Sequence, residues 1–343
     1  MKGLKNKVVA LVAVTTMAMA SLMGCAGANV NNNAVVATVG DSELKAGVAN
    51  FYMRYQQAMY ESYFSALAGE SMWTMEISEG VTYETSIKET VVSELAQMYI
   101  LEDHMGEYNV TISDDEMAAI EKVADAFDAA NDADAKEKVS AQREHIVELL
   151  RLITITNKME DAMTADVDTE VSDDEAAQKK LQYVKFETTV TTDGQTVDMT
   201  EDEIAALKQD AEDFLTEAKA NGDLEAFAKE NDMTPSAVTF DADSTNLPEE
   251  VIAAADVLGE GEFSGVIETE SQGFYVVQLT DLLDEEATET EKEAIVADRK
   301  TARFNELCME WAEATEIDVD GDALNKISFT RLKVTQKVEE TAE

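Results

Sequence analysis

Residues 258–279 read LGEGEFSGVIETESQGFYVVQL, which predicts a turn followed by two β-strands. The glycines of Leu258–Phe263 indicate the turn, and Gly265–Glu268 and Phe274–Leu279 are the strand candidates. Upstream, Leu181–Phe186 alternates like another strand, and three helical patterns lie between it and the turn. This order of one strand, three helices and two strands predicts a compact α+β domain.

Local signals mark where these helices begin and end. Thr200 and Glu203 have capping-box spacing before an apolar helical face, and Asn221-Gly222 predicts the end of that helix. Asp223–Ala228 predicts a second short helix, and Leu247-Pro248-Glu249 is typical of a helix start. The acidic segment Asp166–Asp174 lacks apolar periodicity and is the predicted domain boundary.

The region before this boundary is predicted to be almost entirely helical. It opens with a β-branched strand ending at Val39 and continues with a helical pattern from Glu43. Further helices are predicted over Val81–Met105, from the cap at Ser113, and over Lys136–Met163. The segment from Phe51 to Trp73 is rich in aromatic residues, and methionines are frequent throughout the region. Two interpretations remain: these residues fill a helical core, or they form an apolar cradle for other polypeptides.

The amino terminus has the order of segments expected of an exported lipoprotein. Lys2, Lys5 and Lys7 precede an uncharged apolar run that is too short to favour a permanent transmembrane helix. Leu22-Met23-Gly24-Cys25 then resembles a bacterial lipobox, in which the cysteine receives lipid and becomes the first mature residue. A plain signal peptide or an anchor helix is the alternative. We expect lipidation at Cys25 and a location at the extracytoplasmic face of the cell membrane.

Composition excludes several classes of function. The formal net charge of −46 opposes binding to nucleic acid and to anionic lipid headgroups. Two cysteines and two histidines provide little for a zinc site or a disulfide framework, and no hydrolase or phosphate-binding motif occurs. The carboxylates of Asp318–Asp322 lie beside Gly321 as in calcium loops, but Ile327 occupies the position of the expected bidentate acid, so an ordinary acidic turn is favoured. We therefore predict no metal and no cofactor.

Four segments, taken in order and spacing, resemble the rotamase core of parvulin (PpiC-type) prolyl isomerases. They are Gly222–Ala228, Leu247-Pro248 with Ala253–Ala255, Leu258 with Gly261–Ser264, and Gln272–Leu279. The wider layout, from the lipobox to a final helix over Glu291–Ala314, is similar to foldase lipoproteins of the PrsA type and to SurA-like chaperones. The resemblance implies that this last helix returns to the helical domain with an apolar face of Phe304, Leu307, Cys308 and Trp311.

The resemblance also assigns candidate site residues. It implies a peptide-binding surface around Tyr183, Phe240, Phe274 and Tyr275. The family carries two core histidines, whereas this sequence has Tyr183 and Tyr275 at those positions, so no residue receives a catalytic role. The aromatic proline-pocket position of the family falls on Ala255 or Asp256.

The predicted fold class is α+β: a helical SurA-N-like chaperone domain completed by the C-terminal helix, with an inserted parvulin-like domain. The predicted parts are a signal peptide (1–24), a tether (25–33), the helical domain (34–170), the parvulin-like domain (176–285), the returning helix (286–328) and a tail (329–343). This organisation predicts a membrane-anchored foldase that binds unfolded or nascent secreted polypeptides. An active prolyl isomerase and a solute-binding lipoprotein are the alternatives, and a homodimer stays open.

Overall fold

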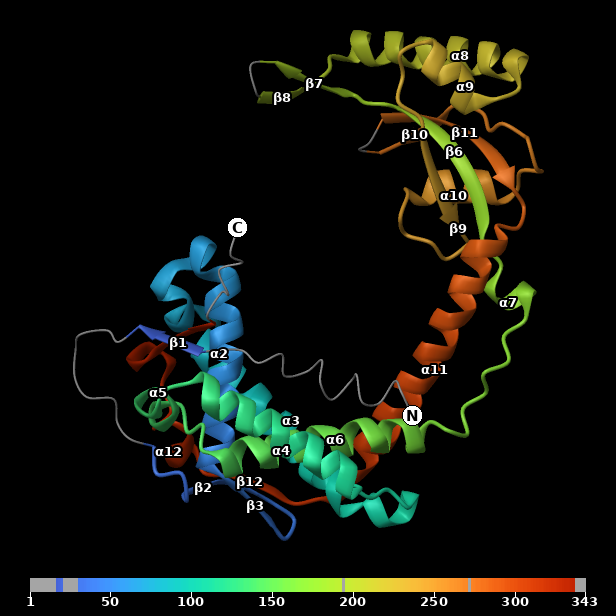
Figure 1. Ribbon diagram of the computed structural model, residues 1–343. Coiled ribbons are helices and arrows are strands. Elements are labelled where there is room, and N and C mark those ends of the chain that lie inside the picture. The colour runs from blue at the N-terminus through green and yellow to red at the C-terminus, as the bar shows by residue number, and fades with distance from the viewer. Residues whose placement is uncertain (1–16, 21–29, 193–194, 271–272, 337–343) are drawn as a thin grey trace. The chain divides into compact units, whose positions relative to one another are not determined.

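The computed structural model describes residues 17–20, 30–192, 195–270 and 273–336, and the chain divides into two compact units (Figure 1). Unit 1 comprises residues 1–166 and 301–343, and unit 2 comprises residues 167–300. Unit 1 is mainly helical, whereas unit 2 is built on an antiparallel sheet, which confirms the α+β class. Two such unlike units do not match the pair of similar α/β lobes expected of a solute-binding protein.

The helices of unit 1 pack around the long helix α2. Its elements before the boundary are β1 (Met17–Ala20), β2 (Val35–Val39), β3 (Ser42–Lys45), α2 (Ala46–Ala68), η1 (Gly69–Thr74), β4 (Glu76–Ser78), β5 (Val81–Thr82), α3 (Tyr83–Asp103), η2 (Met105–Tyr108), α4 (Asp114–Ala130), α5 (Ala133–Lys138) and α6 (Arg143–Met163). The capping box predicted at Ser113 is present, with Ser113 and Glu116 bonded reciprocally at the start of α4.

The C-terminal part of the chain completes unit 1. Helix α11 (Glu285–Ala314) begins in unit 2 and ends in unit 1, and β12 (Ile317–Val319), α12 (Gly321–Leu324), η3 (Phe329–Arg331) and β13 (Lys333–Gln336) follow it. Strand β12 pairs with β2 in a sheet of order β12-β2-β3. Leu307 and Cys308 are buried against side chains of α3 and α6, with Phe304 and Trp311 packed at the edge of this cluster.

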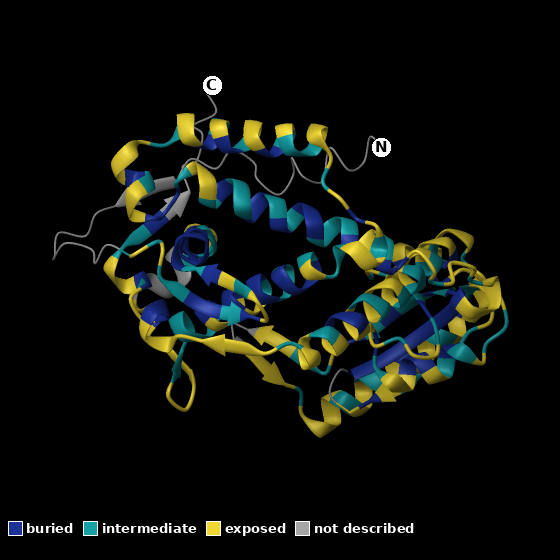
Figure 2. Ribbon diagram, turned by 90° about the horizontal axis from the view of Figure 1, so that it is seen from below, coloured by how far each residue is buried: buried dark blue, intermediate teal, exposed yellow. Residues whose placement is uncertain are grey.

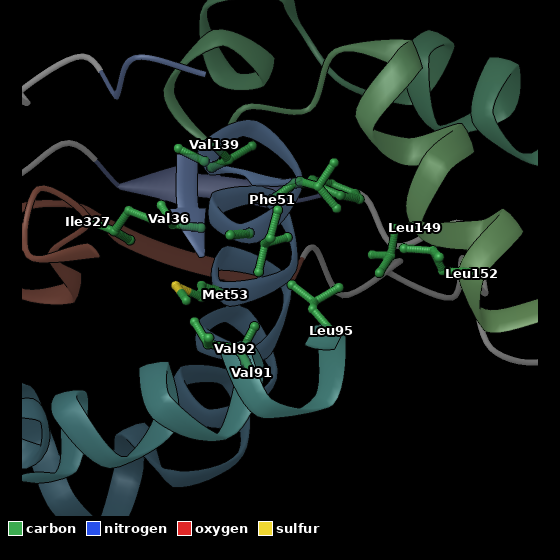
Figure 3. Packing of buried hydrophobic residues seen from close by; sticks show 14 of the residues in the cluster. Val36, Phe51, Met53, Val91, Val92, Leu95, Val139, Leu149, Leu152 and Ile327 are labelled. Atoms are coloured by element: carbon green, nitrogen blue, oxygen red, sulfur yellow. The ribbon is translucent and has the colours of Figure 1, made fainter. Parts of the chain in front are cut away.

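The main core of unit 1 joins segments from both ends of the chain. Figure 3 shows Ile327 of the C-terminal segment beside Val36 of β2, with Phe51 and Met53 of α2 and Leu95 of α3 in the same cluster. All five side chains are buried. Burying apolar surface stabilises a fold by about 25 cal/mol per Å² removed from water. The buried Ile327 therefore makes the C-terminal segment contribute to the stability of this core.

Two sequence predictions for unit 1 are wrong in detail. The helix predicted from Glu43 begins only at Ala46, because Ser42–Lys45 forms β3 and pairs with β2. The single helix predicted over Lys136–Met163 is broken into α5 and α6. Ser140 lies at the break with φ of 56°, and its hydroxyl accepts a hydrogen bond from Asn50 Nδ2 and donates one to Asn32 Oδ1.

Unit 2 is a four-stranded antiparallel sheet with helices on both faces. Its elements, besides the start of α11, are α7 (Asp173–Ala176), β6 (Lys179–Phe186), the hairpin of β7 (Thr189–Thr192) and β8 (Gln195–Asp198), α8 (Glu201–Asn221), α9 (Leu224–Glu230), β9 (Ser236–Phe240), α10 (Glu249–Asp256), β10 (Ile267–Thr269) and β11 (Gly273–Asp281). The sheet order is β10-β11-β6-β9. The predicted helix boundaries are confirmed: Thr200 caps α8, Gly222 ends it with φ of 90°, and Pro248 precedes α10.

The alternation of residues along β6 and β11 gives the sheet two distinct apolar faces. Leu181, Tyr275 and Val277 belong to the face covered by α10, whereas Phe186 and Phe274 belong to the face covered by α8 and α9. Figure 1 shows α10 on one side of the sheet and α8 with α9 on the other. Burial follows this layering, with the central strands buried and the outer helix faces exposed (Figure 2).

Candidate functional site

Two adjoining pockets follow one face of α2 in unit 1. One has a volume of about 170 Å³ and lies between α2, α4 and α6, and the other has a volume of about 390 Å³ and continues along α2. Gln56 lines both pockets, and we call the two pockets together the aromatic groove. Its lining residues are Phe51, Tyr52, Tyr55, Gln56, Met59, Tyr60, Ser62, Tyr63 and Phe64 of α2, Phe127 of α4, and Ile146, Leu149, Leu150 and Ile153 of α6.

The helical repeat explains why these residues line one groove. Tyr52, Tyr55, Met59 and Tyr63 recur at spacings of three and four residues, which places them on one face of α2. Two of them are unusually exposed for large apolar groups: 80% of Tyr63 and 44% of Met59 are accessible to solvent. A contiguous exposed apolar surface of this kind is typical of an interaction site.

Ring contacts fix the wider end of the groove. Tyr60 stacks on Phe64 with ring centroids 6.1 Å apart, and its ring meets those of Trp73 and Tyr83 edge to face. Such aromatic pairs stabilise their geometry beyond simple area burial. The groove wall is therefore held in place by η1 and α3 as well as by α2.

The polar groups that line the groove are tyrosine and serine hydroxyls and the amide of Gln56. Tyr52 donates a hydrogen bond of 2.8 Å to Glu94 Oε2 and accepts one of 3.2 Å from Gln56 Nε2. Burial, together with the carboxylate of Glu94, raises the pKa of Tyr52 well above its ordinary value, and burial raises that of Tyr55. Both tyrosines are therefore uncharged at physiological pH and present an apolar ring with a polar tip.

Of the two interpretations of the methionines, burial favours the helical core for most of them. Met53, Met72, Met159 and Met163 are buried in the cores of unit 1. Among the methionines that could have formed an apolar cradle, Met59 alone lines the groove pockets. The groove is thus formed mainly by aromatic side chains, and the interpretation of the methionines as core residues holds for most of them.

In unit 2, the two tyrosines at the histidine positions of the resemblance come together. Tyr183 of β6 and Tyr275 of β11 have ring centroids 5.5 Å apart, tilted by 41°, and Lys185 Nζ lies 6.0 Å from the Tyr275 ring centroid. Burial raises the pKa of Tyr275, against the opposing effect of Lys185. Tyr275 is 2% exposed and Tyr183 is half-buried, so the Tyr183 ring is the accessible member of the pair.

The other predicted peptide-binding residues do not join this pair at the surface. Phe240 shares the apolar cluster of Tyr183 and Tyr275 but is completely buried, so it packs the core under α10. Phe274 lies on the opposite face of the sheet, because its side chain points the other way from its neighbour Tyr275. The prediction for Phe274 is wrong for this reason of register.

The proline-pocket position contains no aromatic side chain. Ala255 is completely buried in the same cluster as Tyr275. Asp256 instead ends α10 and forms an ion pair with Lys179, at 2.8 Å between Nζ and Oδ1. Neither candidate position for the proline pocket therefore provides an aromatic ring.

Both histidines of the chain have structural partners in unit 1. His104 stacks on Trp311 with centroids 4.0 Å apart, and its Nδ1 lies 2.6 Å from a carboxylate oxygen of Glu107. His145 Nδ1 donates to the Ser140 carbonyl oxygen at 2.7 Å, and its ring lies against Gly47. Neither histidine lies in unit 2, where the resemblance expects the catalytic histidines.

Sequence reasoning missed a buried polar cluster on the other face of α2. Arg54, Gln57 and Glu61 are 4%, 0% and 7% exposed, and with Lys88 of α3 they bind the main chain of residues 327–334. Burial lowers the pKa of Arg54 to about 10, against the opposing effects of Glu84 and Glu61. The i, i+3 and i+4 spacing of polar residues within an otherwise apolar helix was the signal that could have found this cluster.

The acidic turn is explained by local structure. Asp318 lies in β12, and Asp320 caps α12 by accepting a hydrogen bond of 3.0 Å from Ala323 N. Among the described residues, no group of three or more histidine, cysteine or acidic side chains could hold a metal ion. Within the same residues, no helix is long and apolar enough to cross a membrane. Cys25 and the lipobox lie outside the described residues, as does most of the predicted signal peptide.

Comparison with known families identifies the domain in unit 2. Residues 170–294 match the model of the PPIC-type PPIase domain. The chain thus contains a parvulin-type domain, and its sheet carries Tyr183 and Tyr275 at the centre. No functionally curated protein matches the sequence.

Three of the solved structures to which the chain is similar are those of foldases and a SurA-like chaperone. The foldase protein PrsA from Streptococcus pneumoniae is 20% identical, with a TM-score of 0.31, over 75% of this chain and 98% of that one. PrsA from Bacillus subtilis is 16% identical, with a TM-score of 0.24, over 86% and 98%. A SurA-like chaperone structure from Campylobacter jejuni is 11% identical, with a TM-score of 0.20, over 84% and 100%. With TM-scores below 0.5, these similarities support no argument about this chain.

Proposed function

We propose that this protein is an extracytoplasmic foldase that binds unfolded secreted polypeptides and is anchored to the membrane by lipid on Cys25. The observation that carries the proposal is the exposed aromatic groove of α2, in a chain that also contains a PPIC-type domain. The lipobox at Leu22–Cys25 supports removal of residues 1–24 and an anchor at the new amino terminus.

The groove suits segments that are apolar but irregular in sequence. Aromatic rings provide a broad contact surface with few rotatable bonds. Burying a large apolar side chain contributes about 1.5–3 kcal/mol, so a few anchors give weak, reversible binding. The strongly negative charge of the chain keeps this exposed surface soluble and favours basic clients.

In this account the parvulin-type domain serves as a second peptide-binding surface with little or no isomerase activity. Rotation about the bond before proline has a barrier of about 18–20 kcal/mol, which an isomerase lowers by stabilising the twisted amide. Unit 2 places a buried tyrosine and a half-buried tyrosine where the family has histidines, and an alanine and an ion-paired aspartate where it holds proline. An active isomerase that uses these tyrosines is the second candidate function.

Suppression of client aggregation tests the role of the groove. The chain from residue 26 is mixed with several chemically unfolded proteins, and light scattering is followed on dilution. We expect the Met59→Ser and Tyr63→Ser double variant to require at least about tenfold more protein for the same suppression, because two exposed anchors are lost. Met309→Ser in α11 is the control, since Met309 is an exposed apolar side chain of unit 1 that lies outside the groove. Equal suppression by both variants would contradict the proposal.

A protease-coupled assay on a panel of X-Pro peptides separates the two candidate functions. We expect no acceleration above background with the chain from residue 26. Acceleration that is lost in Tyr183→Phe or Tyr275→Phe would establish the isomerase instead. Both substitutions keep the ring packing and remove the hydroxyl alone.

The anchor is tested by the mass of the protein recovered from membranes. Processing and lipidation at Cys25 should remove residues 1–24 and add a diacylglycerol, and Cys25→Ser should abolish both changes. An unprocessed protein in the membrane fraction would contradict the anchor while leaving the groove measurement unaffected.

A further inference from the structure

Strand β13 is bound along one edge by buried side chains of α2. Gln57 Nε2 donates to the Leu332 carbonyl oxygen at 2.6 Å, and Val334 N donates to Glu61 Oε2 at 3.0 Å. Glu61 is itself held by a 2.9 Å hydrogen bond from Trp73 Nε1. The main-chain groups of residues 332 and 334 are therefore directed toward α2.

The other edge of β13 follows from the geometry of a strand. Main-chain groups of successive residues point to opposite edges, so those of Lys333 and Thr335 face away from α2. On that side β1 pairs with β13 in an antiparallel ladder, with Met17, Ala18, Met19 and Ala20 opposite Gln336, Thr335, Val334 and Lys333.

The contact of Val334 with Glu61 fixes which pairs of this ladder share hydrogen bonds. Because Val334 N is bonded to Glu61, Met19 and Val334 form a non-hydrogen-bonded pair. The hydrogen-bonded pairs are then Ala20 with Lys333 and Ala18 with Thr335. A chain in the place of β1 is thus recognised through every second main-chain amide.

The segment that carries β13 has its own attachments to unit 1. Arg54 donates to the Ser328 carbonyl oxygen at 3.1 Å, and Lys88 donates to that of Ile327 at 2.9 Å. Phe329 lies with its ring centroid 4.7 Å from that of Trp73. None of these contacts involves β1, so the segment that carries β13 has attachments to unit 1 that do not depend on β1.

Strand β1 lies within the residues whose removal is part of the proposed function, and the following inference rests on that removal. We propose that the edge of β13 vacated by β1 binds an extended, uncharged segment of an unfolded polypeptide by antiparallel strand addition. An open strand edge presents unpaired donors and acceptors that accept another chain. The Met-Ala-Met-Ala segment already seated there shows the chemistry of the occupant: extended and without charge.

Alternate main-chain methylation provides a matched test. A fluorescein-labelled peptide of residues 14–22 is titrated with the chain from residue 26 and with the full chain, and fluorescence anisotropy is followed. We expect saturable binding to the chain from residue 26 and binding weaker by about tenfold or more to the full chain, whose own β1 competes. N-methylation at Ala18 and Ala20 should weaken binding by about tenfold or more, whereas N-methylation at Met17 and Met19 should change it less than about threefold.

The outcomes separate this site from the proposed function. Equal binding of the two methylated peptides, or no binding to the chain from residue 26, would overturn strand addition. If that sample still suppresses client aggregation, the proposed function survives this result. A dimer of the chain from residue 26 that saturating peptide does not dissociate would also overturn the proposal, since a second copy would then occupy the edge. If the membrane-bound protein retains residues 1–24, β1 still occupies the edge of β13, and this result alone would overturn the proposal.

Discussion

Replacement of Glu61 by alanine should cost more stability than any surface change, because Trp73 Nε1 and Val334 N would lose their acceptor, whereas Gln57 Nε2 keeps the carbonyl oxygens of Phe329 and Leu332. Its two oxygens accept hydrogen bonds from Gln57 Nε2 at 2.7 Å, Trp73 Nε1 at 2.9 Å and Val334 N at 3.0 Å. A buried donor left without a partner costs about 1–3 kcal/mol. Water entering the vacated space offsets part of this cost, so we expect the free energy of unfolding of unit 1 to fall by about 3–5 kcal/mol.

Tryptophan fluorescence during denaturant unfolding measures this loss in the correct unit. The chain has two tryptophans, Trp73 and Trp311, and both lie in unit 1. Glu61→Gln keeps one acceptor oxygen and the side-chain volume, so its expected loss is smaller, about 1–3 kcal/mol. The control is Glu89→Ala on the exposed face of α3, which should change stability by less than about 0.5 kcal/mol. A loss below about 1 kcal/mol in Glu61→Ala would refute the reasoning.

Two further predictions concern the packing and the charges of unit 1. A Cβ at Gly47 would lie 2.3 Å from the ring of His145, whose Nδ1 is bonded to a carbonyl oxygen. Gly47→Ala should therefore lower the melting temperature, at a cost of about 1–3 kcal/mol in stability. His145→Ala in the same chain should restore part of this lost stability. The pKa of Glu116 is lowered: burial acts to raise it, but hydrogen bonds from Lys158 and Ser113 outweigh that effect. Its contribution to stability is therefore present above the unfolded pKa of the carboxyl and is lost as pH falls through the folded value. In Glu116→Gln, the free energy of unfolding should fall less steeply as pH is lowered through this range. An unchanged dependence on pH would contradict the assignment.

The parts of the fold that depend on local chemistry were predictable from the sequence. The capping residues Ser113 and Thr200, the helix end at Gly222 and the strand alternation around Tyr183 and Tyr275 each act within a few residues of the chain. Such short-range signals carry their own geometry, which is why the helices of unit 2 follow from local spacing. The resemblance to parvulins, and not spacing, placed Tyr183 and Tyr275 at related positions of the sheet.

What the sequence did not reveal depends on partners distant in the chain. The break between α5 and α6 is stabilised by Ser140, which bonds to Asn32 and Asn50, about a hundred residues earlier. The polar side chains of Arg54, Gln57 and Glu61 can be buried only because main-chain groups of residues 327–334 form hydrogen bonds with them. The wrong assignment of Phe274 has a smaller cause, since a shift of one residue along a strand exchanges the two faces of the sheet.

The central claim is that the aromatic groove binds unfolded polypeptide, and site-specific photo-crosslinking tests it most directly. A photoreactive phenylalanine analogue is placed at Tyr63 in the groove, or at Asp115 as the control, and the protein is irradiated with a radiolabelled unfolded client. Asp115 lies near the start of α4, about 18 Å along that helix from the groove residue Phe127. The account predicts client crosslinks from position 63 that an excess of unlabelled client removes, and few from position 115. Equal crosslinking from both positions, or none from position 63 while aggregation is still suppressed, would contradict it.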